Sequence, residues 1–476
     1  MKIIKHPLKL YASAKAVITL FLRLPGNDRV HNVVRRLENL NEKDIEEELE
    51  NVMLEFSGRH RHIKEIFLNH FNKIQIQYNS DLSHFTVQKK LLIGSFFTKE
   101  YSFQAAALFN PSIVPHPDQQ GLNPGEKRFI MSLRATGEGH ISSIVFRTGT
   151  FDHYGHINLD APTGFFRSLH KNEAAIYYKK DIQKSTETNQ GFDIKLLDKL
   201  PISFTASEAK SVLKAIPNPG QSVLDSIRIV EELLDMNYEL EDSSFLPISE
   251  KVIFPIAKGE GMGMEDVRLV KFEDEGRVCY YGTYTAYDGK QIKTQLIETV
   301  DFNIFKIRSL FGSAINDKGM ALFPEKVNGQ FVMISRQGGE NINIMFSDDL
   351  YSWKSYQVLM EPLFSWELLQ LGNCGSPIKT EKGWLLLTHG VGAMRKYVIS
   401  AILLDLNNPI RIIGRMNKPF IEADESEREG YVPNVVYTCG FMHHGDSIII
   451  PYAISDSATG FMTVSLEDLL NEIEII

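Results

Sequence analysis

Residues 328–337 read NGQFVMISRQ, and residues 347–353 read SDDLYSW. The first segment opens with a turn and continues as a short apolar run that ends in polar and charged residues, and the second is a Ser/Asp/Trp turn. Related phrases recur at several points along the chain. Such repetition is typical of a β-propeller, in which each blade is one four-stranded unit and the inner strands bring polar side chains to a central funnel. The pattern therefore predicts an all-β fold.

Short apolar runs bounded by Gly, Asp and Asn begin at about residue 90 and continue to the end of the chain. They have the length of strands and include Phe129–Leu133, Val278–Tyr284, Phe331–Ile334, Trp384–Thr388 and Ser447–Pro451. Many strands at short spacing favour a sandwich, a barrel or a propeller. We expect residues 86–476 to form one propeller domain.

Helical periodicity appears in two other parts of the chain. Residues 44–56 carry an apolar stripe opposite an acidic face, and a second stripe follows from Ile63 to Phe71, which predicts a helical module over residues 1–85. The segments SEAKSVLKAI (207–216) and SVLDSIRIVEELLDM (222–236) return to the same spacing. They predict a helical insertion over about residues 163–245, either a cover for the funnel or surface decoration.

Composition and charge exclude several classes of protein. The chain has 476 residues, of which 43% are hydrophobic and 23% charged, as in ordinary globular proteins. A net charge of −9 argues against binding to the nucleic-acid backbone. Three widely spaced cysteines without a CxxC pair suggest neither a disulfide framework nor a zinc site. No apolar run approaches the roughly 20 residues that span a bilayer, so we expect a cytoplasmic protein without membrane contact.

The segment GMGMEDVRL at residues 261–269 carries the chemistry that the sequence makes most explicit. Strand alternation would put Asp266 and Arg268 on one face and Glu265 on the other. A buried carboxylic acid with a guanidinium group nearby, its pKa set by burial against charge pairing, suits general acid catalysis on a glycosidic oxygen. By itself, however, an Asp-x-Arg pair is more often a structural salt bridge.

Several long motifs in a fixed order resemble those of one enzyme family. They are GMGMEDVRL, YYGTYTAYDG (280–289), KGMALFPEKVNGQFVMISR (318–336), GNCGSPIKTEKGWLLLTHGVG (372–392), LLDLNNPIRIIGR (403–415) and EREGYVPNVVYTCG (427–440). Over about residues 100–460 the chain resembles glycoside hydrolase family 130, the mannoside phosphorylases and related β-mannosidases. The resemblance implies a five-bladed β-propeller that cleaves β-mannosidic bonds in its central funnel.

The resemblance also implies roles for the residues that would hold and cleave the sugar. Asp266 matches the catalytic aspartate, which protonates the glycosidic oxygen through a hydroxyl of the bound mannose while the nucleophile attacks from the opposite face with inversion. Arg134 in FIMSLR, Asn110 in FNPS, Asp456 in PYAISD and Tyr284 match or lie in the substrate-binding motifs.

A second group of residues determines which nucleophile attacks the sugar. Arg336 and His389 match residues that hold phosphate in the phosphorylases, where converging donors bind the dianion. Gln370 stands at or near a position where phosphorylases usually have lysine, and Arg395 is a candidate to supply the lost charge. Water would be the alternative nucleophile, with Glu340 or Glu367 as candidate base.

Phosphorolysis of a β-mannoside, giving α-mannose 1-phosphate, is therefore the expected activity, and an inverting β-mannosidase is the first alternative. A non-catalytic mannoside-binding propeller is the second, because a sugar-binding funnel can persist after chemistry is lost. We expect inorganic phosphate as co-substrate and no metal or other cofactor. A β-mannoside is the expected partner, and assembly into a homo-oligomer stays open.

Overall fold

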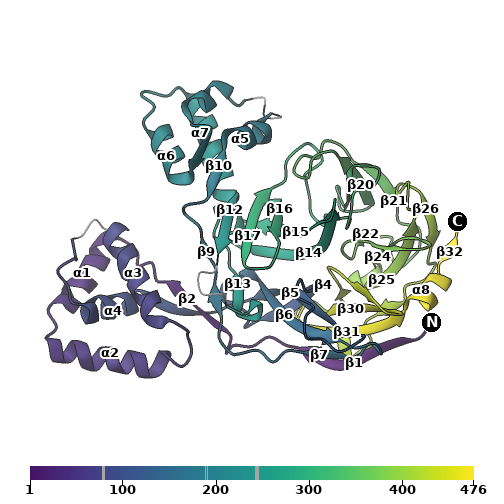
Figure 1. Ribbon diagram of the computed structural model, residues 1–476, viewed down its shortest axis with the longest axis horizontal. Helices are drawn as coiled ribbons and strands as arrows, with labels where there is room; N and C mark the ends of the chain where they lie inside the picture. Colours follow the sequence, from purple (N-terminus) through teal and green to yellow (C-terminus); the bar gives the residue numbers. More distant parts are fainter. Residues whose placement is uncertain (78–80, 188, 190, 242–245) are drawn as a thin grey trace.

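The computed structural model describes residues 1–77, 81–187, 189, 191–241 and 246–476. The protein is mostly β, with groups of helices on one side of the sheets (Figure 1). This confirms the fold class at the level of its main secondary structure. No helix among the described residues is long and apolar enough to cross a membrane.

One long sheet carries the first half of the β structure. Its strands follow the order β4 (Ala107–Pro115), β5 (Lys127–Thr136), β6 (Ser142–Phe151), β14 (Gly263–Asp274), β15 (Arg277–Tyr287), β16 (Ile292–Thr299), β17 (Ile304–Ser309), β12 (Tyr238–Glu241) and β9 (His170–Lys171). The short strands β7 (Ile157–Leu159), β8 (Arg167–Ser168) and β13 (Lys251–Ile253) pair beside this path. A single parallel pair, Gly263 with Ser142, joins β14 to β6.

Three further sheets follow in sequence order. The first contains β18 (Ala321–Leu322), β19 (Phe331–Ser335), β20 (Ile342–Ser347) and β21 (Gln357–Met360). The second contains β22 (Gln370–Asn373), β23 (Ile378–Thr380), β24 (Gly383–Val391), β25 (Tyr397–Leu404), β26 (Ile412–Arg415), β27 (Ile421–Glu422) and β32 (Glu474–Ile475). The third contains β28 (Val436–Tyr437), β29 (Met442–His444), β30 (Ser447–Ile454), β31 (Ala458–Ser465) and β1 (Ile3–Leu10). Figure 1 shows these sheets and the long sheet arranged around a common centre.

Strand β1 pairs antiparallel with β31, so that Ile3 lies opposite Val464. The predicted helical module of residues 1–85 therefore differs from the structure at its beginning, where β1 and then β2 (Val17–Phe21) precede the helices. Strand β2 pairs with β3 (Thr98–Ser102), which follows the helices in the sequence. The sequence did not predict a strand here, because the register of β1 on β31 is irregular between Lys5 and Lys9 and the apolar residues do not alternate regularly.

The helices of this region are α1 (Asn27–Glu38), α2 (Glu42–Phe56), α3 (Ile63–Gln77) and α4 (Val87–Phe96). The predicted stripes are confirmed, since Ile45, Leu49, Ile63 and Phe67 are buried in one shared cluster. Arg61, between α2 and α3, donates from Nε and Nη2 to the buried Glu250 carboxylate at 2.9 Å each. This contact ties the helices to the segment that enters β13.

The predicted insertion is helical where it was expected to be. It contains α5 (Lys179–Thr186), α6 (Ala206–Lys214) and α7 (Gln221–Met236), with the hairpin of β10 (Ile176–Tyr178) and β11 (Ser203–Thr205). Residues 188, 190 and 242–245 of the predicted span lie outside the described residues. Beyond the prediction, the segment also supplies β9 and β12, which extend the long sheet past β17.

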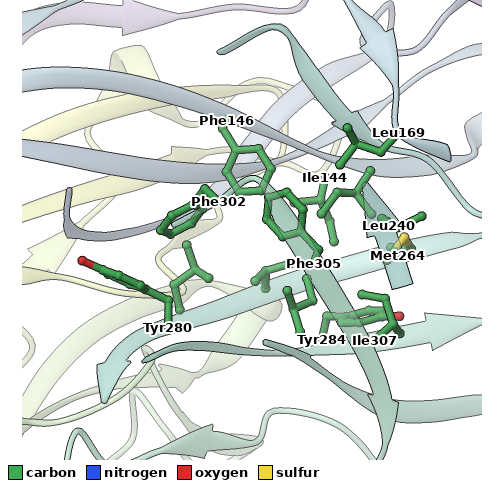
Figure 2. Close-up of a cluster of buried hydrophobic side chains, with 14 of the residues drawn as sticks. Ile144, Phe146, Leu169, Leu240, Met264, Tyr280, Tyr284, Phe302, Phe305 and Ile307 are labelled. Carbon is green, nitrogen blue, oxygen red and sulfur yellow. The ribbon is translucent and has the colours of Figure 1, made fainter. Parts of the chain in front are cut away.

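An aromatic core fixes the strand that carries the candidate acid. Phe146 from β6 stacks on Phe305 at 5.7 Å between ring centroids and meets Phe302 edge-on at 6.0 Å (Figure 2). Met264 from β14 and Tyr284 from β15 are buried in the same cluster. Because such interiors are close-packed, β14 is held in position on this face by side chains from β6, β15 and β17. One last helix, α8 (Leu466–Asn471), follows β31.

Candidate active site

Two β-bulges bring the first site residues out of their strands. The register of β4 on β5 shifts between Phe109 and Ser112, and that of β14 on β15 shifts between Glu265 and Arg268. Asn110 and Asp266 lie at these shifts with φ of 49° and 55°, in the left-handed region. A bulge bends its strand and re-aims one side chain, and backbone strain of this kind clusters at functional sites.

The two bulged residues meet at one carboxylate oxygen. Asn110 Nδ2 donates to Asp266 Oδ1 at 2.6 Å, and Arg134 Nη1 donates to the same oxygen at 3.2 Å. The Arg134 guanidinium also donates from Nη2 to Glu265 Oε1 at 2.6 Å and from Nε to Ser142 Oγ at 2.9 Å. The planar fork of one arginine therefore orients both acidic side chains of the Glu-Asp pair.

This arrangement corrects the expectation that Asp266 and Arg268 share a face opposite Glu265. The bulge interrupts the alternation, so Arg134 reaches both acidic side chains. The Arg268 side chain, only 4% exposed, donates instead to the Asp266 backbone carbonyl at 3.1 Å and to the Tyr437 hydroxyl at 2.5 Å. Arg268 thereby supports the strained backbone of the bulge.

The charges around Asp266 set its protonation in the free site. Burial by itself would raise the pKa of Asp266, but the Arg134 and Arg268 guanidinium groups and the Asn110 hydrogen bond hold it below its ordinary value. Lys318 adds to this lowering of the pKa. The Asp266 carboxyl is therefore ionised at neutral pH when no ligand is bound.

His389 lies in β24, opposite Gly372 of β22, and is 1% exposed. Its Nδ1 is 3.2 Å from the Asn373 carbonyl oxygen, and Gln370 Nε2 is 3.4 Å from its Nε2. Burial, followed by the charges of Arg336 and Arg268, holds the pKa of His389 well below its usual range. The imidazole is therefore neutral. A proton on Nδ1 would be donated to the carbonyl, leaving Nε2 as an acceptor for the Gln370 amide.

Arg336 directly follows β19 and its charge acts on His389. Among the described residues its buried Nε has no hydrogen-bond partner. Buried guanidinium nitrogens are normally paired, so this one is a candidate for a ligand contact. Arg336, Gln370 and His389 thus come together as the sequence predicted.

Asp456 and Arg395 approach the same centre from the last two sheets. Asp456 follows β30 with φ of 49°, and Arg395 follows β24 with φ of 56°. Burial, followed by the negative charge of Asp266, raises the pKa of Asp456 to about 6, while Arg134 and Arg395 oppose the rise. Asp456 therefore shares an electrostatic environment with Asp266.

Tyr284 is a correction to the predicted set. Its ring is buried in the core cluster of Figure 2, and its hydroxyl donates to Glu260 Oε1 at 2.5 Å. Side chains alternate along β15, and Tyr284 lies on the face that packs against the core. The side chain is 1% exposed and cannot meet a sugar in this arrangement.

The carboxylates considered as bases for water are not arranged for that work. Glu367 is fully buried, and its Oε1 accepts from the backbone N–H groups of Leu363 and Phe364 and from Arg415. Such a carboxylate serves to fix a loop. Glu340 is exposed to solvent. In the described part of the chain, no group of three or more His, Cys, Asp or Glu side chains is placed to hold a metal ion.

Sequence reasoning missed several residues of this site. Glu265 and Tyr437 contact predicted members directly, and the Lys318 charge acts on Asp266. Lys318 and Tyr437 lie within the motifs KGMALFP and VVYTCG quoted above, so these motifs could have identified both residues as site candidates. Their contacts join segments of different sheets that are far apart in the sequence, which local pattern does not encode.

Comparison with known proteins gives the family. Residues 228–474 match the sequence model of glycoside hydrolase family 130, described as β-1,4-mannooligosaccharide phosphorylase. A 1,2-β-oligomannan phosphorylase of Thermoanaerobacter sp. (strain X514) is 33% identical over 231 residues, which are 48% of this chain and 76% of the relative. A β-1,2-mannobiose phosphorylase of Listeria innocua is 28% identical over 261 residues, 53% of this chain and 70% of the relative.

One solved structure was also matched. The complex of a β-1,2-mannobiose phosphorylase from Listeria innocua with β-1,2-mannobiose has 20% identity and a TM-score of 0.46, covering 77% of this chain and 92% of that chain. A family model that spans more than half of the chain, together with relatives matched over most of their length, decides the assignment. The chain belongs to glycoside hydrolase family 130.

Proposed function

We propose that the protein is an inverting β-mannoside phosphorylase. The reaction would move a mannosyl group from a β-mannoside to inorganic phosphate and give α-mannose 1-phosphate. The proposal is supported by the mannoside phosphorylases among the relatives. The observation that carries it in this chain is the convergence of Asn110 and Arg134 on one oxygen of Asp266 at a strained bulge.

Asp266 is the proposed acid. In the free site it is ionised, so the proton must arrive with the ligands. Sugar hydroxyls that compete for Arg134 and Asn110, and a phosphate anion nearby, would both raise the pKa of Asp266. The protonated acid then gives its proton to a mannose hydroxyl, which passes its own proton to the leaving oxygen. The C1–O bond to the acceptor breaks as a phosphate oxygen forms its bond to C1 from the opposite face.

Phosphate is proposed to bind beside Arg336, Gln370 and His389. Arg336 supplies the charge, the Gln370 amide and the neutral His389 imidazole supply hydrogen bonds, and Arg395 and Lys318 add positive potential. Asn110, Arg134 and Asp456 would hold the mannose. Replacement of lysine by glutamine removes one charge, and a charge-assisted hydrogen bond contributes roughly 1.5–3 kcal/mol, so phosphate binding is weakened without being lost.

We propose a five-bladed β-propeller for residues 86–476, with the segment around 163–245 inserted and the helices of residues 1–85 attached. Support comes from the sheets that contain β5, β15, β24 and β30, which lie around one centre (Figure 1). Strand β1 would then be part of the last blade rather than of the helical module. A ring of blades brings residues from the whole chain to one funnel.

The deciding experiment incubates the protein with β-1,2-, β-1,3- and β-1,4-mannobiose, with and without phosphate. We expect mannose 1-phosphate that forms only when phosphate is present. Free mannose released at an equal rate without phosphate would establish the β-mannosidase instead, the alternative favoured by Gln370 in place of lysine. Tight binding of these mannosides without any turnover would establish the non-catalytic propeller.

A further inference from the structure

The turn that carries Asp456 is strained at two consecutive residues. Ser455 and Asp456 have φ of 46° and 49°, in the left-handed region that residues with a Cβ atom rarely adopt. Such a conformation is unfavourable, and it persists only where the surrounding structure determines it. The direction of the Asp456 side chain therefore depends on the contacts that hold this turn.

Those contacts come from the chain before β28 and centre on Ser455, which is fully buried. Ser455 Oγ donates to the Glu427 carbonyl oxygen at 2.6 Å, and Ser455 N donates to the Val435 carbonyl oxygen at 2.8 Å. The Ser455 carbonyl oxygen accepts from Val432 N at 3.0 Å. A Cβ atom on Gly430 would lie 2.5 Å from that same carbonyl oxygen, so the two segments lie in direct contact. The segment that begins at Glu427 thus holds the turn in place.

The N-terminal strand holds Glu427 itself. The Glu427 side chain is buried, and Lys5 of β1 donates from Nζ to Glu427 Oε2 at 2.7 Å. Lys5 Nζ also donates to Asp424 Oδ2 at 2.7 Å, and the Tyr452 hydroxyl donates to Glu427 Oε1. Burial would lower the pKa of Lys5, but hydrogen bonds to its two carboxylate partners raise it above its ordinary value. The ammonium group is therefore charged at neutral pH and fixes both carboxylates.

Strand pairing alone does not explain this lysine. The pairing of β1 with β31 uses backbone groups, and a lysine that served only solubility would face water. Lys5 instead meets a carboxylate whose side chain is 2% exposed. We propose that Lys5 and Glu427 are positioning residues for the mannose site, which hold the Asp456 turn in the strained form that aims its carboxylate at the sugar. The inference rests on the proposed role of Asp456 in mannose binding, and it makes the sugar site depend on the first strand of the chain.

Isothermal titration calorimetry of the full-length protein tests this role with mannose as the probe of the sugar site and inorganic phosphate as the probe of the phosphate site. Neither ligand can react alone. Lys5→Met should weaken mannose binding by about fivefold or more and leave phosphate binding within about twofold, because only Asp456 loses its support. Lys5→Arg keeps the charge and should recover most of the mannose affinity. Lys9→Met, elsewhere on β1, should leave both affinities unchanged.

A second variant guards against misfolding, because Lys5→Met leaves the buried Glu427 carboxylate without its cation. Ser455→Ala removes the hydrogen bond to the Glu427 carbonyl oxygen without changing any charge, and it should weaken mannose binding with the same selectivity. The double variant Lys5→Met/Ser455→Ala should bind mannose within about twofold of the weaker single variant, since both changes release one turn. Circular dichroism confirms the folding of each variant.

Three results would overturn the inference. They are wild-type mannose affinity in folded Lys5→Met, equal losses of mannose and phosphate affinity in Ser455→Ala, and fully additive losses in the double variant. A wild-type protein that binds no mannose would overturn it as well. Failure of the proposed phosphorylase activity is seen separately, as absence of mannose 1-phosphate from the wild-type protein supplied with mannobioses and phosphate. Mannose binding that depends on Lys5 would support the positioning role even then.

Discussion

At the scale of single residues, Asp266 is the group on which the proposed proton transfer depends. Asp266→Asn keeps the shape and can still accept from Arg134, but it has no acidic proton to give. Positioned acids contribute roughly 10²–10⁴-fold to rate, so we expect phosphorolysis to fall by about that factor. The measurement is kcat for mannose 1-phosphate formation with the folded protein confirmed by circular dichroism. Asp274→Asn, on the same strand β14, should retain activity within about twofold.

Asp456 should make stability depend on pH. Its pKa rises from about 4 in an unfolded chain to about 6 in the folded protein. The folded state therefore binds more protons between these values, and the free energy of unfolding falls as pH rises from about 4 to about 6. Asp456→Asn should remove this fall, which we expect to be on the order of 1–3 kcal/mol. Denaturant titrations at pH 4.5 and pH 7 measure it.

The exposed Asp446→Asn protein is the control for that titration. It should keep the wild-type pH dependence. If the free energy of unfolding changes by the same amount between pH 4.5 and pH 7 in the wild type and in Asp456→Asn, the pKa of Asp456 is not raised in solution.

The motifs predicted which residues of the candidate site lie near one another, but they did not predict the directions of all the side chains. Asn110, Arg134, Asp266, Arg336 and His389 all lie at motif positions, and the structure brings them together. Strand alternation failed at Arg268, because a bulge inserts an extra residue and reverses the faces beyond it. The aromatic pattern also misplaced Tyr284, since a tyrosine at the end of an apolar run fits a core as well as a funnel.

At the scale of elements, the pairing of β22 with β24 fixes the proposed phosphate site. A Cβ atom on Gly372 would lie 2.3 Å from Cε1 of His389, so this strand pair tolerates only glycine there. Gly372→Ala should push the imidazole away from Gln370 and raise KM for phosphate by about tenfold, the loss of roughly one hydrogen bond. KM for the mannoside should change little. Gly58→Ala, with open space around it, is the control.

Helices were easier to predict than strands at this scale. The stripes of α2, α3 and α7 repeat at helical spacing over many residues, which leaves little ambiguity. Strand β1 has an irregular register and is rich in lysine, and its partner lies at the other end of the chain. Pairing between such distant segments leaves no trace in local sequence.

At the scale of the whole molecule, two ion pairs join the N-terminal helices to the sheets. Glu250 is 1% exposed and bonds to Arg61 through both oxygens, while the ion pair of Glu65 and Arg167 is half exposed at its acidic partner. Glu250→Gln replaces a paired buried carboxylate, so it should lower the melting temperature clearly more than Glu65→Gln does. Differential scanning calorimetry compares the two. Equal melting temperatures would show that the helices are held by apolar packing alone.

The ring of sheets was predictable as a class, because repeated phrases along the sequence favour repeated units. The position of the attached helices relative to the ring was not predictable from the sequence. It depends on single ion pairs such as that of Arg61 with Glu250, whose partners are far apart in the sequence. The sequence of the insertion likewise predicts only separate helices, whereas in the structure β9 and β12 join the insertion to the long sheet.

The pairing of β1 with β31 has a consequence for synthesis of the chain. Ile3 leaves the ribosome about 460 residues before its partner Val464. At 5–20 residues per second, the strand waits about 20–90 s for its place. Throughout that time its backbone is an unpaired edge that other nascent chains could extend. Lys2, Lys5 and Lys9 place charge along this edge, which is how natural strands are kept from aggregating. The same lysines that make this strand hard to predict thus oppose its association with other chains during translation.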